Sequence, residues 1–250
     1  MIYFKNDTLL NKNNFGGYIN MRIGIIGAMS EEVQGFKKLL ENIDEEKIGN
    51  LTFYTGVIHG KDIVLLETGI GKVNATIGTT LLIEAFDVEA IIFTGVAGGI
   101  NEELDLGDVV ISKDLIQHDV DVTAFGEKLG VIPRMEKSIF EADAGLIDLA
   151  VKAGKKLKGK VIVGRILSGD QFIASPEKIA FLKKEFNGDC AEMEGAAVGH
   201  VCQIFDIPFV VVRTMSDKAN SNAHTDYATF MKIAAENSIT LVNEMLLNLK

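Results

Sequence analysis

Short apolar runs that are rich in β-branched residues recur along the whole chain, and they constrain its fold more than any other feature. Each run is apolar at consecutive positions, which is typical of strands in a sheet that is covered on both faces. Amphipathic helical patterns lie between the runs, so the sequence predicts a three-layer α/β/α fold. The strand-like runs are 22–27, 62–68, 90–95, 108–116, 160–168 and 209–216, and the helix candidates are 31–42, 72–86, 143–156, 175–186, 194–205 and 226–248.

One segment makes the central sheet mixed. Residues 51–68, LTFYTGVIHGKDIVLLET, form two strand-like runs around His59-Gly60-Lys61, with glycine at a turn position, as in a hairpin. No linker, low-complexity stretch or internal repeat follows Met21, and the length of 250 residues suits one α/β domain. We predict one domain over residues 21–250. The Asn-rich residues 1–20 lack the apolar core of a secretion signal and are predicted to be a disordered extension or a non-native start.

Composition argues against several classes of partner. A net charge of −10 and a pI near 5.0, with no basic stripe, disfavour nucleic-acid binding. No apolar run approaches the roughly 20 residues that cross a membrane. Cys190 and Cys202 are most simply free thiols in a reducing compartment, so we expect a cytoplasmic protein. The four histidines are scattered without ligand spacing, and we expect neither a metal nor a cofactor.

Glycine-rich turns follow several of the predicted strands. Residues 69–72, GIGK, lack the spacing of a P-loop, and Asn74 stands where a dinucleotide fingerprint would have its third glycine. Residues 94–99, TGVAGG, are better interpreted as a bend that lets the backbone approach a ligand at the carboxyl end of a strand. A plain tight turn is the alternative at this position.

Carboxylates occur at three places where a site could form. Glu32 lies early in a predicted helix, where an acid can also simply favour the helix dipole. Glu192 and Glu194 precede Gly-Ala-Ala at the start of an apolar helix, which indicates carboxylates that are held near a site. Asp217 ends the most apolar strand, a typical position for active-site residues, although an N-cap or a partner for Arg213 is the alternative.

Seven segments, taken in order and spacing, resemble the 5'-methylthioadenosine/S-adenosylhomocysteine nucleosidase family over residues 21 to about 249. They are GIIGAMSEEV, ETGIGKVNA, TGVAGG, HDVDVTAFG, SGDQFI, AEMEGAAV and FVVVRTMSD. The resemblance implies the nucleoside phosphorylase/nucleosidase fold and a homodimer. It also implies hydrolysis of methylthioadenosine, S-adenosylhomocysteine and 5'-deoxyadenosine to adenine and the matching ribose, in methionine salvage and removal of S-adenosylhomocysteine.

The same resemblance implies a division of labour among three carboxylates. Glu32 is expected to activate the attacking water, Asp217 to deliver a proton to N7 of adenine, and Glu194 to bind the ribose hydroxyls. Adenine leaves poorly as an anion, and a buried carboxylic acid can supply the proton that it needs. An acid and a base on opposite faces of a sugar with oxocarbenium character give an inverting hydrolysis, so the α-anomer is predicted as the first product.

Further residues line the pocket by resemblance. Phe172 is similar in position to a base-stacking ring, and Ile173 to a residue whose backbone contacts the adenine edge. Val96 stands where relatives often have serine. Ser216 and Arg213 are expected to hold Asp217 in place, and Met29, Ile70 and Met193 to line the pocket near the ribose and the alkylthio group. Tyr227, where a Phe is frequent, is expected near the thio tail. Val122, Phe125 and Pro133 are expected to reach the partner subunit's pocket.

Three other functions compete with this interpretation. A purine nucleoside phosphorylase needs an Arg-rich anion pocket, whereas GAMSEEV contains Glu32 and no arginine. An aminodeoxyfutalosine or futalosine nucleosidase of menaquinone synthesis has the same fold and stays open. A catalytically silent adenosine-binding protein is disfavoured because all three carboxylates are present.

Overall fold

The computed structural model describes residues 21–218 and 223–249, with the backbone alone for 223–228. The predicted extension at residues 1–20 lies outside the described part. The strands are β1 (Ile23–Gly27), β2 (Glu41–Ile48), β3 (Leu51–Ile58), β4 (Lys61–Glu67), β5 (Ala90–Gly99), β6 (Val109–Gln117), β7 (Ile139–Glu141), β8 (Val161–Ser168), β9 (Cys190–Glu192) and β10 (Phe209–Asp217). The α-helices are α1 (Ser30–Leu39), α2 (Lys72–Phe86), α3 (Ala144–Gly154), α4 (Pro176–Phe186), α5 (Gly195–Phe205) and α6 (Ala223–Asn248), and Thr123–Phe125 form a 3-10 turn.

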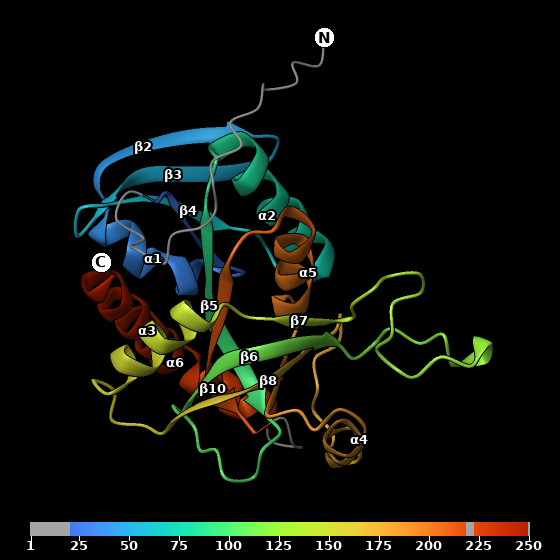
Figure 1. Ribbon diagram of the computed structural model, residues 1–250. Helices are drawn as coiled ribbons and strands as arrows, with labels where there is room; N and C mark the ends of the chain where they lie inside the picture. The colour runs from blue at the N-terminus through green and yellow to red at the C-terminus, as the bar shows by residue number, and fades with distance from the viewer. Residues whose placement is uncertain (1–20, 219–222, 250) are drawn as a thin grey trace.

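A mixed sheet forms the middle of the molecule, as the sequence predicts (Figure 1). Strands β4, β1, β5 and β10 run parallel to one another, so their carboxyl ends meet at one edge. The hairpin of β3 and β4 turns through His59 and Gly60, both with positive φ, which confirms the predicted turn. β5 also pairs with β9, and the path β5, β10, β6, β8, β9 returns to β5, so this part of the sheet closes on itself.

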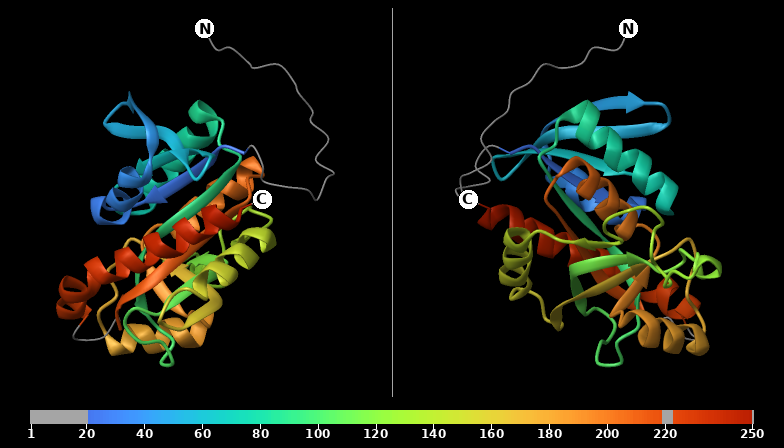
Figure 2. Two further views of the ribbon diagram at one scale, coloured as in Figure 1. Left: turned by 90° about the vertical axis from the view of Figure 1, so that its left-hand side faces the viewer. Right: turned by 45° about the vertical axis from the view of Figure 1, so that its right-hand side comes forward.

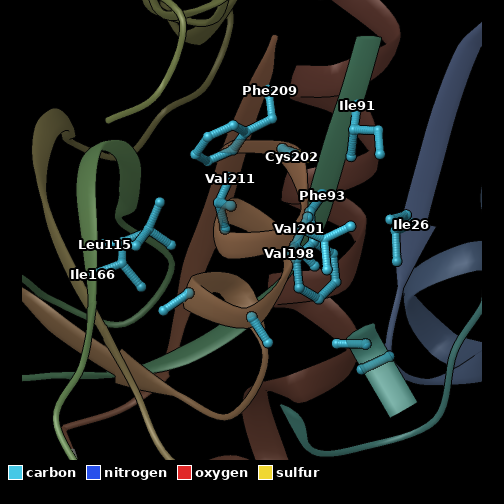
Figure 3. Packing of buried hydrophobic residues seen from close by; sticks show 14 of the residues in the cluster. Ile26, Ile91, Phe93, Leu115, Ile166, Val198, Val201, Cys202, Phe209 and Val211 are labelled. Carbon is cyan, nitrogen blue, oxygen red and sulfur yellow. The ribbon is translucent and has the colours of Figure 1, made fainter. Parts of the chain in front are cut away.

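Helices cover the sheet on two sides, which confirms the three-layer prediction. Helices α1, α3 and α6 contact one another on one side, and α2 and α5 pack together on the other (Figures 1 and 2). Two separate apolar clusters fill the interfaces. Figure 3 shows how Val198 and Val201 of α5 lie among the side chains of Phe93, Phe209 and Val211 from β5 and β10. Burial of this apolar area drives the packing of α5 on the sheet.

Three strands are absent from the sequence prediction, and two of them, β7 and β9, have only three residues each. β2 has the sequence ENIDEEKI and is exposed along almost its whole length, so it carries no apolar pattern. Its acidic side chains sit on an edge strand, where charge opposes pairing with other chains. β9 has only three residues and merges with the segment before α5. The prediction of a helix over 31–42 is too long because β2 begins at Glu41.

Residues 94–99 are neither a bend nor a tight turn. They continue β5, which pairs with β10 up to Gly98 and with β9 at Gly98 and Gly99. The glycines in this strand leave room for side chains of neighbouring elements to approach closely, and they do not change the direction of the chain.

Candidate active site

A cavity of about 310 Å³ opens where the parallel strands β1, β5 and β10 end. Ligands bind at this edge in open α/β sheets. The cavity brings together Glu32, Glu194 and Asp217, which lie far apart in the sequence. Its other lining residues are Ala28, Met29, Ile70, Val96, Ala97, Gly98, Phe172, Ala191, Glu192, Met193 and Ser216.

Glu32 is fixed by backbone donors in the first turn of α1. Its Oε2 accepts hydrogen bonds from the amides of Ala28 (2.7 Å) and Met29 (3.0 Å), and its Oε1 accepts one from Val96 (3.1 Å). The residue is 4% exposed. Burial raises the pKa of Glu32, although Arg213 and the three amides oppose the increase. Glu32 therefore accepts hydrogen bonds from backbone amides and also faces the cavity with a raised affinity for protons.

Gly95 on β5 allows two charged groups to approach the same point. A Cβ atom at this position would lie 2.5 Å from Oε1 of Glu32 and 2.7 Å from Nη1 of Arg213. Both distances are shorter than any ordinary carbon contact. Nη1 of Arg213 has no hydrogen-bond partner among the described residues. Glycine is therefore required here, and the free N–H groups of Nη1 lie close to Glu32.

Arg213 forms its ion pair with Glu192, a partner for which the sequence gives no indication. Its Nε and Nη2 donate to Oε2 of Glu192 at 3.1 and 2.6 Å, and Nη2 lies 3.8 Å from Oε2 of Glu194. Its guanidinium stacks 3.9 Å over the ring of Phe93. The predicted role of Arg213 in holding Asp217 in place stays a prediction. A fully buried guanidinium needs a buried carboxylate nearby, and Glu192 supplies it.

Glu192 is the main residue of this site for which the sequence analysis gives no role. Besides Arg213, its carboxylate accepts hydrogen bonds from the amides of Glu194 (3.2 Å) and Gly195 (2.7 Å) and from the hydroxyl of Ser168. It thus joins β8, β10 and the start of α5. The pair of glutamates before Gly-Ala-Ala was a signal of desolvated carboxylates, but the sequence could not tell which one faces a substrate.

Glu194 occupies the N-cap position of α5, and its Oε1 accepts a hydrogen bond from the amide of Gly71 (2.8 Å). The residue is 6% exposed. Burial, followed by the negative charge of Glu192, raises the pKa of Glu194 to about 8, against the opposing effects of Arg213 and Gly71. Glu194 therefore holds its proton at neutral pH.

Asp217 lies at the end of β10, where a bulge changes the register. Met215 pairs with Ala97, whereas Asp217 pairs with Gly98. Neighbouring side chains of a regular strand point to opposite faces, yet Ser216 and Asp217 both line the cavity. Oγ of Ser216 donates to Oδ2 of Asp217 at 3.1 Å, and Asp217 is 2% exposed.

The apolar residues predicted for the pocket divide into two groups. Met29, Ile70, Met193 and Phe172 line the cavity, and Ile70 and Phe172 are each 52% exposed. The side chain of Ile173 does not line it and instead packs in a small core with Leu167 and Phe186. The predicted backbone contact of Ile173 stays a prediction.

The residues predicted to reach a partner subunit lie outside the cavity. Val122, Phe125 and Pro133 belong to the long connection between β6 and β7, and Phe125 is 89% exposed. The side chain of Tyr227, on α6, lies outside the described residues.

Neither a metal-binding cluster nor a membrane-spanning helix occurs among the described residues. Over residues 21–218 and 223–249, no group of three or more His, Cys, Asp or Glu is arranged to hold a metal ion. Within the same ranges, no helix has the length and apolarity to cross a membrane.

Comparison with known proteins places this site in a family. Residues 22–247 match the family model described as the phosphorylase superfamily. The 5'-methylthioadenosine/S-adenosylhomocysteine nucleosidase of Halalkalibacterium halodurans is 47% identical over 222 residues, which cover 88% of this chain and 96% of that protein. The chain belongs to the 5'-methylthioadenosine/S-adenosylhomocysteine nucleosidase family. The resemblance that seven sequence segments carried is thereby confirmed.

Solved structures of the nucleosidase family superpose closely on this fold. The enzyme of Neisseria meningitidis, solved in complex with methylthio-immucillin-A, has a TM-score of 0.88 at 38% identity and covers 92% of this chain and 100% of its own. A futalosine hydrolase of Helicobacter pylori reaches the same TM-score at 37% identity, with coverage of 92% and 98%. Substrate class within this fold is thus a separate question from family membership.

Proposed function

We infer that the chain hydrolyses the N-glycosidic bond of 5'-methylthioadenosine and S-adenosylhomocysteine, and that it also accepts 5'-deoxyadenosine. The observation that carries this inference is the convergence of Glu32, Glu194 and Asp217 on one largely apolar cavity, in a chain of the nucleosidase family. Its metabolic place is methionine salvage and the removal of S-adenosylhomocysteine.

Glu32 acts as the general base in this proposal. Three backbone amides fix its carboxylate, and Nη1 of Arg213 lies beside its Oε1 around Gly95. A water held there donates to Glu32 while it accepts a hydrogen bond from Arg213. The raised pKa of Glu32 makes this carboxylate a stronger base for the proton that the water loses as it attacks C1'.

Asp217 and Glu194 serve the two parts of the nucleoside. Asp217 delivers a proton to N7 of adenine, which withdraws electrons from the breaking bond, and Ser216 orients its carboxyl group. Glu194 binds the ribose hydroxyls, and Phe172 stacks on the base. With the base and the acid on opposite faces of the sugar, the reaction inverts the anomeric centre and forms the α-anomer first.

A futalosine-type nucleosidase is the second candidate. The Helicobacter pylori futalosine hydrolase supports it, because that protein combines a TM-score of 0.88 with 37% identity. The chemistry at the glycosidic bond is shared, and only the 5' substituent differs. The open rim of the cavity, with Ile70 and Phe172 half-exposed, sets no strict limit on that substituent.

A homodimer completes the site in this proposal. Val73, Ile77 and Ile204 are 69%, 48% and 65% exposed, and they border a groove between α2 and α5 of about 570 Å³. Exposed apolar patches of this kind mark protein interfaces. A second copy of the chain would cover them and bring Val122, Phe125 and Pro133 to the partner's cavity. Sedimentation equilibrium tests the dimer, and a monomer at micromolar concentration contradicts it.

We also propose a cytoplasmic location. Cys190 and Cys202 are free and buried, and burial raises the pKa of both thiols well above the ordinary value of a cysteine. Such thiols stay protonated and inert, as is typical of structural cysteines in a reducing compartment.

An adenine-release assay tests the proposed reaction directly. The purified protein is incubated with methylthioadenosine, S-adenosylhomocysteine and aminofutalosine, each with and without phosphate. We expect adenine and a free thio-ribose at equal rates in both buffers. Dependence on phosphate with release of a ribose 1-phosphate identifies a phosphorylase, and a strong preference for aminofutalosine favours the second candidate.

A further inference from the structure

Three residues from separate elements form a closed ring of hydrogen bonds beside the cavity. Nζ of Lys72 bonds Oδ1 of Asp119 at 2.6 Å. Oδ2 of Asp119 accepts from the amide of Asp170 at 3.0 Å. Oδ1 of Asp170 in turn accepts from the amide of Lys72 at 2.8 Å. The ring joins the start of α2, the segment after β6 and the loop after β8.

The ring differs from an ordinary surface ion pair. The side chains of Lys72 and Asp119 are only 18% and 15% exposed. Burial alone would raise the pKa of Asp119, but Lys72 and the amide of Asp170 lower it, so the carboxylate stays ionised at neutral pH. Charge-assisted bonds in a partly buried position are stronger than neutral ones and are less screened by salt. Nζ of Lys72 has a second anchor at Oε1 of Gln117, 3.1 Å away.

The loop 168–173 is also supported from below. His118 is 3% exposed, and a Cβ atom on Gly169 would lie 2.5 Å from its Nε2. Neither imidazole nitrogen of His118 has a hydrogen-bond partner among the described residues, so the imidazole serves as a packing surface. The loop therefore rests on His118 and is tied at Asp170 to Asp119.

Two members of the hydrogen-bond ring, Lys72 and Asp170, are near neighbours in sequence of residues that belong to the candidate active site. Gly71, directly before Lys72, donates its amide to Glu194 at 2.8 Å. Phe172 follows Asp170 by two residues on the same loop and lines the cavity. Gly71 has a positive φ, which favours glycine. The absence of a Cβ atom also lets Asp170 approach, because a Cβ atom on Gly71 would lie 3.1 Å from Oδ1 of Asp170.

We propose that Lys72 and Asp119 are positioning residues that hold the base-stacking loop and the ribose-binding carboxylate in register, so that Phe172 and Glu194 engage one nucleoside together. This inference rests on the proposed nucleosidase function. Neither side chain lines the cavity, so each acts through its neighbours. Loss of the ring weakens binding of the nucleoside more than it slows the chemical step, since Glu32 and Asp217 stand on other elements.

A tryptophan reporter tests the ring without any assay of activity. The chain contains no tryptophan, so Phe172→Trp places a single fluorophore on the loop. In this background, Asp119→Asn and Lys72→Met are each expected to lower the fluorescence anisotropy and raise the acrylamide quenching constant. Asp121→Asn is the matched control, because Asp121 is exposed and bonds only Thr123 in its own segment. Circular dichroism confirms that each variant is folded.

Kinetics with Phe172 retained provide the second arm. Asp119→Asn and Lys72→Met are expected to raise KM for methylthioadenosine about tenfold, as for the loss of one charged hydrogen bond, and to change kcat less than about threefold. Lys72→Arg, which keeps the charge, is expected to recover most of the loss. Fluorescence and KM that match the Asp121→Asn control, or a fall in kcat alone, overturn the proposal. If the unmutated protein releases no adenine, the proposed reaction fails, while the fluorescence arm still decides whether the ring holds the loop.

Discussion

The two ends of the cavity are built in opposite ways. At the inner end, Glu32, Glu192, Glu194, Arg213 and Asp217 are each no more than 8% exposed, and all of them except Asp217, which accepts from Ser216 of its own strand, have partners on other elements. At the rim, Ile70 and Phe172 are 52% exposed, and Phe125, which we propose enters the partner's cavity, is 89% exposed. The charged groups of the inner end have partners within the chain, whereas the rim presents apolar surface that, in our proposal, a ligand or a second subunit covers.

This contrast separates chemistry from recognition. Buried charges must be paired in advance, because an unpaired charge in a low-dielectric interior is very unfavourable. Apolar groups at a rim can stay exposed at little penalty and gain stability when they are covered. Changes at the inner end should therefore alter rate or folding stability, and changes at the rim should alter substrate binding. The following experiments test that division.

Asp217→Asn should have the largest effect. Asparagine keeps the shape of the side chain but cannot deliver the proton to N7, so adenine release is expected to fall about a thousandfold with the fold intact. Single-turnover adenine release and thermal unfolding measure the two quantities. Ser216→Ala, which removes only the hydrogen bond to Oδ2, is the graded control with a smaller loss. Near-normal turnover in Asp217→Asn contradicts the proposed acid.

Glu192→Gln should have the largest effect on folding stability. It leaves the buried guanidinium of Arg213 without its counter-charge, and the free energy of unfolding should fall by about 3 kcal/mol. Urea unfolding at fixed protein concentration measures the change. The double variant Glu192→Gln/Arg213→Met removes both charges and should regain stability without regaining activity. A single variant as stable as the parent would mean that the inner end does not depend on this pair.

Phe125→Ala tests the rim. Because the ring is 89% exposed, its removal should change monomer stability by less than about 0.5 kcal/mol. If Phe125 enters the partner's cavity, KM for methylthioadenosine should rise about tenfold, as for loss of one apolar contact. Glu127→Ala in the same segment is the control. A loss of stability comparable to that of Glu192→Gln would break the division between the two ends.

The last test concerns the dependence of folding stability on pH. The pKa of Glu194 is about 8 in the folded state, against an ordinary value of 4.5, so the folded chain holds a proton that the unfolded chain releases. The free energy of unfolding of the substrate-free protein should therefore decrease as pH rises from about 5 to 8. Chemical unfolding across this range measures the slope. Glu194→Gln should flatten it, and an unchanged slope contradicts a protonated Glu194.

Much of the fold was predictable because its signals are local. The strands that the sequence analysis identifies are buried on both faces and therefore apolar, and the hairpin turn at His59 and Gly60 has its own residue preference. β2 escaped prediction because it is polar and its place is set by pairing with β3. The continuation of β5 through Gly99 likewise depends on β10 and β9 as partners.

The candidate site shows the same difference between features that local sequence signals predict and features that depend on partners elsewhere in the chain. Residue order and spacing alone selected the family, the mixed α/β fold and the three carboxylates that share the cavity. Only the tertiary structure decided that Arg213 pairs with Glu192, that a bulge turns Ser216 and Asp217 into the same cavity, and that Lys72 pairs with Asp119. Local patterns determine where strands and helices begin. The partner of a buried charge depends on which groups packing places within a few ångströms, across separations of 21 to 123 residues that no local pattern records.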